Sequence, residues 1–396
     1  MKHPIKKFFF VVAILFCFTT NAQKEVNFDS SGFRSVMNRA KAEHKPVFYM
    51  LYATWCSHCN KMKSEVFKDS TVANFMNKNF ICAWQDIEKG EGEFFKGSFG
   101  VKAYPTFLFL DENEALLYNF NSEKKADDFL IEAKNALNLQ MQLPYLEKQF
   151  NADFSNGDKC LNYINILKKG SDRKVLNPIA QKYLATQSDT QLVSDTNWKI
   201  IANAVTDIES RPFQYVLQHQ KEFETVASSK RIQKKIGNII TELLQPYTVH
   251  ADTLTYQKKR AICKSINLHL SDSLVLNYDL QVYEKAKNWP AYCKSAPEYV
   301  EKFVWTNDKI IKDISNNYWI HTYDETHLKQ AITWTKHANE ILESTDGFIL
   351  LSKLYQKIND PKNAILFAQT AKDRNKSLGF NTKEADDLLL QLSVKQ

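Results

Sequence analysis

Hydrophobic and polar positions in the first third of the chain alternate between helical and strand-like spacing. Apolar residues between 33 and 40 recur at the spacing of an amphipathic helix, after a Ser30-Ser31 pair that predicts its cap. Pro46 then opens an apolar run over 47–53, which is typical of a buried strand. A helix followed by a strand begins an alternating α/β pattern.

The same alternation continues to about residue 139. A short polar turn at 111–114 separates two apolar runs and predicts a β-hairpin. The predicted elements are a helix that begins with the cysteine pair 56/59, a helix after an Asp69-Ser70 cap, strands over 80–84, 106–110 and 115–120, and a closing helix over 126–137.

Beyond Leu143-Pro144 the strand-like spacing almost disappears. Only five glycines occur in the remaining region, at 157, 170, 237, 347 and 379. We therefore predict an α/β domain over 23–140 and an all-α region over 141–396.

Two patterns in the second region indicate helical repeats. Prolines fall at 144, 178, 212 and 246, a spacing of 34 residues, and residues 328–338 realign with 361–371 after 33 residues. The second pattern resembles a tetratricopeptide repeat, clearest over 314–379, with a turn at 359–361. An irregular bundle of amphipathic helices is the alternative.

The N-terminus has the features of a secretory signal peptide over 1–22. A basic start precedes an apolar run at 8–18 and a small-residue site before Gln23, and this run is shorter than the roughly 20 residues that span a bilayer. We expect an exported, periplasmic protein rather than an anchored one. Without its three signal lysines the formal net charge falls from +7 to +4, and the mixed charges give no indication of nucleic acid binding.

Six cysteines follow the signal peptide, and only Cys56 and Cys59 are close in sequence. Such sparse spacing excludes a disulfide-stapled small domain, so this pair indicates chemistry. Cys82 in a predicted strand is expected to be a small buried thiol. The sequence leaves the pairing of Cys82, Cys160, Cys263 and Cys293 open.

A CxxC motif at the start of a helix favours a reactive first sulfur. Unpaired backbone N–H groups and the helix dipole stabilise a thiolate there, so Cys56 is the expected nucleophile and Cys59, one turn on, the resolving thiol. Ser57 and His58 lie between them, and an imidazole at His58 would stabilise the thiolate and make the disulfide more oxidising. A zinc site would need a second ligand pair nearby, which the first domain lacks, and no metal is expected.

Three segments together resemble the thioredoxin superfamily: YATWCSHCNKM at 52–62, EVF at 65–67 and YPTF at 104–107. The likeness covers about 26–139 and is similar to exported thioredoxin-like proteins and to the C-terminal periplasmic domain of the thiol:disulfide interchange protein. It implies a thioredoxin-like α/β fold with a central mixed sheet flanked by helices.

The resemblance also implies roles for particular residues. It implies a cis Tyr104-Pro105 bond beside the sulfurs, with the Tyr104 backbone free to pair with a substrate, and an apolar flank at Trp55. The redox-active Cys56–Cys59 disulfide would be the cofactor, with no other required. Thioredoxins usually carry a buried acid where this chain has Met50, while Lys63 and Glu65 are expected on a solvated helix face.

The sequence therefore predicts an exported thiol-disulfide oxidoreductase acting on the thiols or disulfides of exported proteins, with a membrane electron donor as a candidate partner. His58 favours oxidation and the family resemblance favours reduction, so the direction of electron flow stays open. The alternative function is a helical-repeat module that binds a client peptide and carries a redox-sensing domain.

Overall fold

The computed structural model describes residues 25–250 and 252–393. The chain divides into two compact units, the first ending at Val205 and the second beginning at Thr206. The signal peptide predicted over 1–22 lies outside the described residues. In the described ranges, no helix has the length and apolar character that a bilayer crossing requires.

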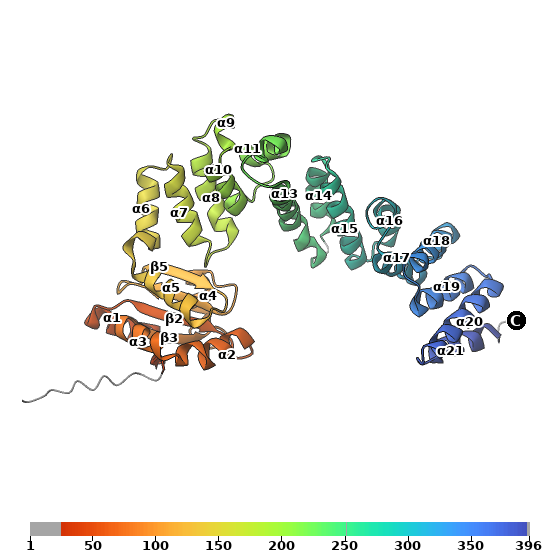
Figure 1. Ribbon diagram of the computed structural model, residues 1–396, viewed down its shortest axis with the longest axis horizontal. Helices are drawn as coiled ribbons and strands as arrows, with labels where there is room; N and C mark the ends of the chain where they lie inside the picture. Colours follow the sequence, from red (N-terminus) through yellow and green to blue (C-terminus); the bar gives the residue numbers. More distant parts are fainter. Residues whose placement is uncertain (1–24, 251, 394–396) are drawn as a thin grey trace, which may run out of the picture. The chain divides into compact units, whose positions relative to one another are not determined.

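The first unit contains a five-stranded mixed sheet with strand order β1-β3-β2-β4-β5 (Figure 1). Strands β1, β3 and β2 run parallel, β4 is antiparallel to β2, and β5 returns along β4 as the predicted hairpin. The strands are β1 (Phe28–Asp29), β2 (Val47–Tyr52), β3 (Ile81–Asp86), β4 (Thr106–Leu110) and β5 (Leu116–Asn121). The predicted thioredoxin-like sheet is thus confirmed.

Helices cover both faces of this sheet. Successive side chains of the buried strand β2 point to opposite faces, so both faces carry apolar groups that pack against helices. Phe48 packs against Phe129 of α5, while Tyr49 on the other face packs against Phe33 of α1 and Phe95 of α4. The helical segments are α1 (Phe33–Glu43), α2 (Ser57–Ser64), the 3-10 turn η1 (Val66–Lys68), α3 (Ser70–Asn79), α4 (Gly92–Phe99), α5 (Ala126–Leu137) and the 3-10 turn η2 (Leu139–Met141).

The start of α1 differs from the sequence prediction. Gly32, with a positive φ of 89°, occupies the cap position in place of the Ser30-Ser31 pair. The carboxylate of Glu91, just before the unpredicted helix α4, accepts a hydrogen bond of 2.7 Å from the Phe33 N–H. Glu91, 58 positions further along the chain, therefore accepts the hydrogen bond that a local cap residue was expected to accept.

Five further helices belong to the first unit. The turn between α7 and α8 contacts the sheet through Lys169, whose carbonyl accepts a hydrogen bond of 3.1 Å from Asn121 N–H and whose ammonium binds Glu132 of α5. These helices are α6 (Leu143–Ala152), α7 (Gly157–Leu167), α8 (Arg173–Leu184), α9 (Asp189–Leu192) and α10 (Asp195–Ala204). The last strand of the sheet ends at Asn121, and the compact unit continues past the predicted boundary at 140/141 to Val205.

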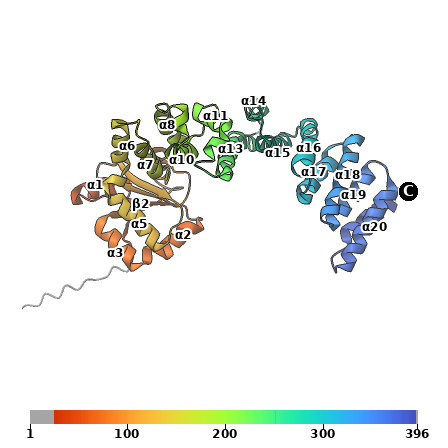
Figure 2. The ribbon, with the colours of Figure 1, turned by 45° about the horizontal axis from the view of Figure 1, so that its top comes forward.

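The second unit is built from helices, as predicted (Figure 2). They are α11 (Arg211–Gln218), α12 (Gln220–Phe223), α13 (Ser229–Leu244), the 3-10 turn η3 (Gln245–Thr248), α14 (Thr253–Lys264), α15 (His269–Lys285), α16 (Trp289–Phe303), α17 (Asp308–His321), α18 (Glu325–Ile341), α19 (Thr345–Lys357), α20 (Pro361–Ser377) and α21 (Lys383–Ser393).

The two sequence patterns for repeats differ in their structural support. The predicted turn separates α19 from α20, Asp360 caps α20, and Ala364 and Ala371 are fully buried where these helices pack. The four evenly spaced prolines do not occupy equivalent places, because Pro178 lies inside α8 while Pro144 and Pro212 open helices. A tetratricopeptide-like repeat over 314–379 stays a prediction.

Candidate active site

Cys56 stands at the N-cap of α2, directly after the loop that follows β2. Its sulfur accepts a hydrogen bond of 3.1 Å from the Cys59 N–H, one of the first-turn donors that have no partner within the helix. A sulfur in this place also lies at the positive end of the helix dipole. The local geometry expected of a reactive first cysteine is therefore present.

The two cysteines form a disulfide with their Cα atoms 5.3 Å apart. Cys59 is completely buried, whereas 5% of Cys56 is exposed. An attacking sulfur from outside therefore reaches Cys56 first. Ser57, the residue after Cys56, is exposed as the first residue of α2.

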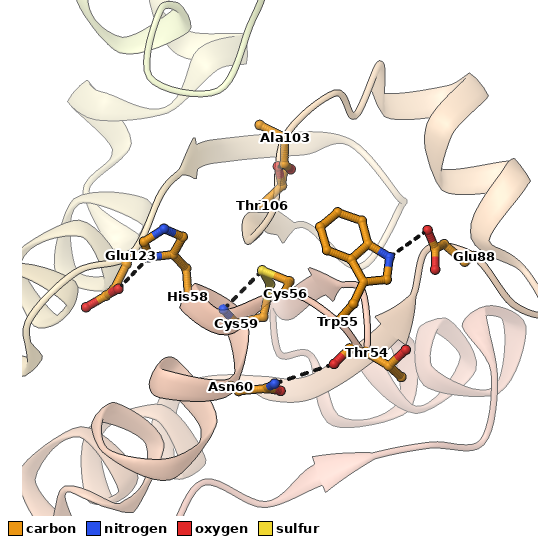
Figure 3. The surroundings of a disulfide bond; sticks show 10 residues. All are labelled: Thr54, Trp55, Cys56, His58, Cys59, Asn60, Glu88, Ala103, Thr106 and Glu123. Carbon is orange, nitrogen blue, oxygen red and sulfur yellow. Dashed lines mark hydrogen bonds and ion pairs between the residues drawn. A yellow bond between two sulfur atoms is a disulfide. The ribbon is translucent and has the colours of Figure 1, made fainter. Parts of the chain in front are cut away.

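His58 turns toward Glu123 and away from the sulfurs (Figure 3). Its Nδ1 lies 2.8 Å from Glu123 Oε2, and the other carboxylate oxygen lies 2.5 Å from Lys61 Nζ. Hydrogen bonds from Lys61 and His58 hold the pKa of Glu123 below its ordinary value. No pattern in the sequence pointed to Glu123, because the fold alone brings the end of β5 beside α2.

Trp55 and Tyr104 form an aromatic flank beside the disulfide. Trp55 is 68% exposed, donates a hydrogen bond of 2.9 Å from its indole N–H to Glu88, and meets the Tyr104 ring edge to face at 6.1 Å. Figure 3 shows the indole beside the cysteines. The sequence pattern predicted no role for Glu88, as it predicted none for Glu123.

The Tyr104-Pro105 peptide bond is cis, as the family resemblance implied. The loop around it is fixed by its own hydrogen bonds: Ser122 N–H donates to the Pro105 carbonyl at 3.0 Å and the Thr106 hydroxyl to the Ala103 carbonyl at 2.7 Å. The structure thus brings Cys56, Cys59, Trp55, His58 and Tyr104 to one end of the sheet.

Lys63 departs from the expected solvated face, although Glu65 is exposed as predicted. The Lys63 ammonium lies 2.9 Å from the centre of the Tyr52 ring and 4.8 Å from that of Trp84. Burial lowers the pKa of Lys63 to about 8, and the nearby Asp86 opposes this shift. Met50, at the place of the usual acid, is fully buried in β2 between Trp84 and Phe107.

The other cysteines of the described ranges are buried and free. Burial raises the pKa of each thiol, to about 12 for Cys160 and Cys263, which makes them poor nucleophiles at neutral pH. Cys82 is buried in β3 as expected. Among residues 25–250 and 252–393, no three or more His, Cys, Asp or Glu side chains are grouped to hold a metal ion.

The part of the chain that contains this site is similar to known proteins. Residues 30–112 match a protein-family model described as thioredoxin-like. Mouse protein disulfide-isomerase A5 is 30% identical over 124 residues, which are 31% of this chain and 23% of that protein, and the bovine protein of the same name is 29% identical over 104 residues, 26% and 19% respectively. The chain thus spans less than a quarter of the length of these relatives.

Two solved structures are also similar. One, from Bacteroides thetaiotaomicron and described provisionally as a disulphide-isomerase, is 33% identical, covering 29% of this chain and 97% of that one with a TM-score of 0.28. The other, the DsbH oxidoreductase, is 19% identical over 29% of this chain and 87% of its own, with a TM-score of 0.26. The family match and the sheet around the CxxC disulfide identify the N-terminal part of this chain as a thioredoxin-like domain of the thioredoxin superfamily, followed by a helical region.

Proposed function

We propose that the protein is an exported thiol-disulfide oxidoreductase that exchanges disulfides with protein substrates. The observation that carries this proposal is the Cys56–Cys59 disulfide at the start of α2, in which Cys56 is 5% exposed and Cys59 is fully buried. The matches to protein disulfide-isomerase A5 support the same chemistry. Export to the periplasm rests on the predicted signal peptide.

Reduction of a substrate proceeds by two exchanges. The Cys56 thiolate attacks one sulfur of the substrate disulfide, forming a mixed disulfide and releasing the other substrate sulfur as a thiolate. Deprotonated Cys59 then attacks the Cys56 sulfur, which forms the Cys56–Cys59 disulfide and releases the second substrate thiolate. Two electrons pass to the substrate, and the reverse sequence oxidises a dithiol.

The surroundings of the disulfide suit an extended protein segment. Trp55 and Tyr104 offer an exposed aromatic surface, and the backbone before Pro105 would pair with the substrate chain. No organic cofactor or metal is required by this chemistry, because electrons enter and leave through thiols of exported proteins or of a membrane electron donor. With His58 in the motif, we expect a potential more oxidising than about −270 mV, the thioredoxin value.

Trapping the mixed disulfide tests the proposal. Cys59→Ser cannot resolve the first exchange, so incubation with scrambled ribonuclease should give a covalent adduct that dithiothreitol releases. Cys56→Ser is the matched control and should give none. Lack of an adduct with Cys59→Ser, or equal adducts with both variants, would contradict the proposal.

The alternative is that the helical region binds a client and the thioredoxin-like domain senses redox state. A groove of about 740 Å³ between α19, α20 and α21 favours it, because Leu378 and Phe380 on its wall are exposed. Under this alternative, Cys56→Ser would retain full function in client binding. If Cys56→Ser loses a thiol-exchange activity on the client but still binds it, the two parts act together: the helical region binds the client and the thiols act on it.

A further inference from the structure

The carboxylate of Glu123 holds an imidazole and an ammonium group of the active-site helix at once. One oxygen lies 2.8 Å from His58 Nδ1 and the other 2.5 Å from Lys61 Nζ. Because the two partners occupy separate oxygens, Lys61 fixes the carboxylate while the carboxylate fixes the imidazole. Charge-assisted bonds of this kind are stronger and more directional than neutral ones.

The backbone places Glu123 here. Ser122, just before it, has a positive φ of 77° and donates its N–H to the Pro105 carbonyl at 3.0 Å. Glu123 therefore leaves the end of β5 from a loop that is bonded to the cis-proline segment. Its side chain is only 24% exposed, so the carboxylate lies between α2 and this loop rather than in open solvent.

An unrestrained His58 would have a different effect on the nucleophile. It lies two residues after Cys56, and an imidazolium near a thiolate stabilises the charged sulfur and therefore the reduced form. Figure 3 shows the imidazole directed to Glu123 instead, on the side away from the Cys56 sulfur. The pairing thus holds the His58 imidazole away from the thiolate.

We propose that Glu123, anchored by Lys61, is a positioning residue that holds His58 away from Cys56 and so makes the Cys56–Cys59 disulfide less oxidising than its Ser-His dipeptide would otherwise make it. The proposal rests on the function proposed above, because it concerns the redox equilibrium of the same cysteine pair. It adds a residue outside the CxxC motif that sets this equilibrium.

The test is the equilibrium of the full-length mature protein with glutathione. One protein disulfide and two glutathione thiols give one protein dithiol and one glutathione disulfide, so the equilibrium constant reports the stability of the reduced form. It should be measured at pH 7 for wild type, Glu123→Gln, His58→Gln and the double variant, which together form a double-mutant cycle. Glutamine keeps the length of Glu123 and removes its charge.

We expect Glu123→Gln to raise this constant about tenfold, which corresponds to roughly 30 mV for a two-electron couple. In the His58→Gln background the same change should raise it less than about twofold, because no imidazole remains to be released. Glu112→Gln is the matched control: it removes a similar pair with His44, 3.1 Å apart, at the opposite end of β2 from the cysteines. It should leave the constant unchanged.

Each other outcome is decisive. No change or a fall with Glu123→Gln would overturn the inference, and an equal rise in both backgrounds would overturn it too, by showing a direct charge effect without positioning. If Glu123→Gln fails to fold, Lys61→Met frees the carboxylate and should shift the constant in the same direction by a smaller factor; no shift would overturn the inference. A wild-type protein that does not equilibrate with glutathione would instead refute the proposed function.

Discussion

Position at a helix start distinguishes Cys56 from the other described cysteines. The first-turn N–H groups of α2 and the helix dipole act on its sulfur, whereas Cys82, Cys160 and Cys263 are buried among apolar groups that favour the neutral thiol. Cys293 is buried in the same way. The same side-chain type is therefore the proposed nucleophile at one place and a buried core residue at four others.

This difference predicts an activated thiolate in the reduced protein. The absorbance of the Cys56 thiolate should titrate well below the free-cysteine pKa of about 8.5, because the helix start stabilises the charged form. Cys56→Ser should abolish this titration. A Cys56 thiol that titrates like free cysteine would move the weight of evidence to the helical region as the functional part.

Lys63 should titrate near pH 8, since burial against Tyr52 and Trp84 lowers its pKa to about 8. The ¹³Cε chemical shift of Lys63 measures this pKa directly. The folded pKa lies below the unfolded value, so the folded protein gains stability relative to the unfolded chain as pH rises from about 8 to about 10.4. Lys63→Met should remove that gain, and an identical pH profile for the variant would show that the ammonium is not buried.

At the scale of elements, a polar network joins β5, α5 and the α7–α8 turn. Glu132 accepts hydrogen bonds from Tyr118 and from Lys169, the latter at 2.7 Å. Burial by itself raises the pKa of Glu132, but these hydrogen bonds outweigh it and hold the pKa below its ordinary value. The carboxylate therefore stabilises the fold above its unfolded pKa, and this contribution is lost as pH falls through the folded pKa.

Glu132→Gln should accordingly destabilise β5 and α5 by about 1–3 kcal/mol at pH 7, because Lys169 loses its charged partner. Native-state hydrogen exchange of the amides in these two elements measures the loss, which should shrink below pH ~4 as the wild-type carboxylate protonates. Glu93→Gln removes an exposed pair with Lys96 and should change the same amides by less than about 0.5 kcal/mol. Equal effects of the two variants would contradict this account.

Elements with a local pattern could be predicted from the sequence, and those fixed by distant partners could not. The apolar run of β2, the hairpin turn and the Asp69 cap of α3 each carry a signal within a few residues, and all three are present. Helix α4 lacked such a pattern and was missed. Glu91, Glu88 and Glu123 act on residues 33 to 65 positions away, so their roles follow only from the folded sheet.

At the scale of the whole molecule, the sheet and helices α6–α10 share one compact unit. The predicted boundary at 140/141 and the end of that unit at Val205 therefore suggest different minimal fragments. Residues 23–205 keep the contacts of the α7–α8 turn with β5 and α5, and also the ion pair at 2.7 Å between Asp172 of that turn and Lys102, which lies between α4 and β4. A fragment ending at residue 140 loses all of them.

We expect the 23–205 fragment to fold and to exchange disulfides, and the 23–140 fragment to melt at a lower temperature. The missing contacts with α6 and α7 leave apolar surface of β5 uncovered, which reduces the free energy of unfolding. Circular dichroism melting of both oxidised fragments tests this. Equal melting temperatures would place the stable domain at residues 23–140.

The bond between the Asn121 N–H and the Lys169 carbonyl also bears on self-association. Strands β1 and β5 are the two edges of the sheet, and an exposed edge is a template for pairing with another chain. β1 contains only two residues, and α6 and α7 pack over β5 while Lys169 takes up one of its backbone donors. Both edges are thus protected against intermolecular strand addition, which limits uncontrolled pairing of the sheet with extended segments of the proposed protein substrates.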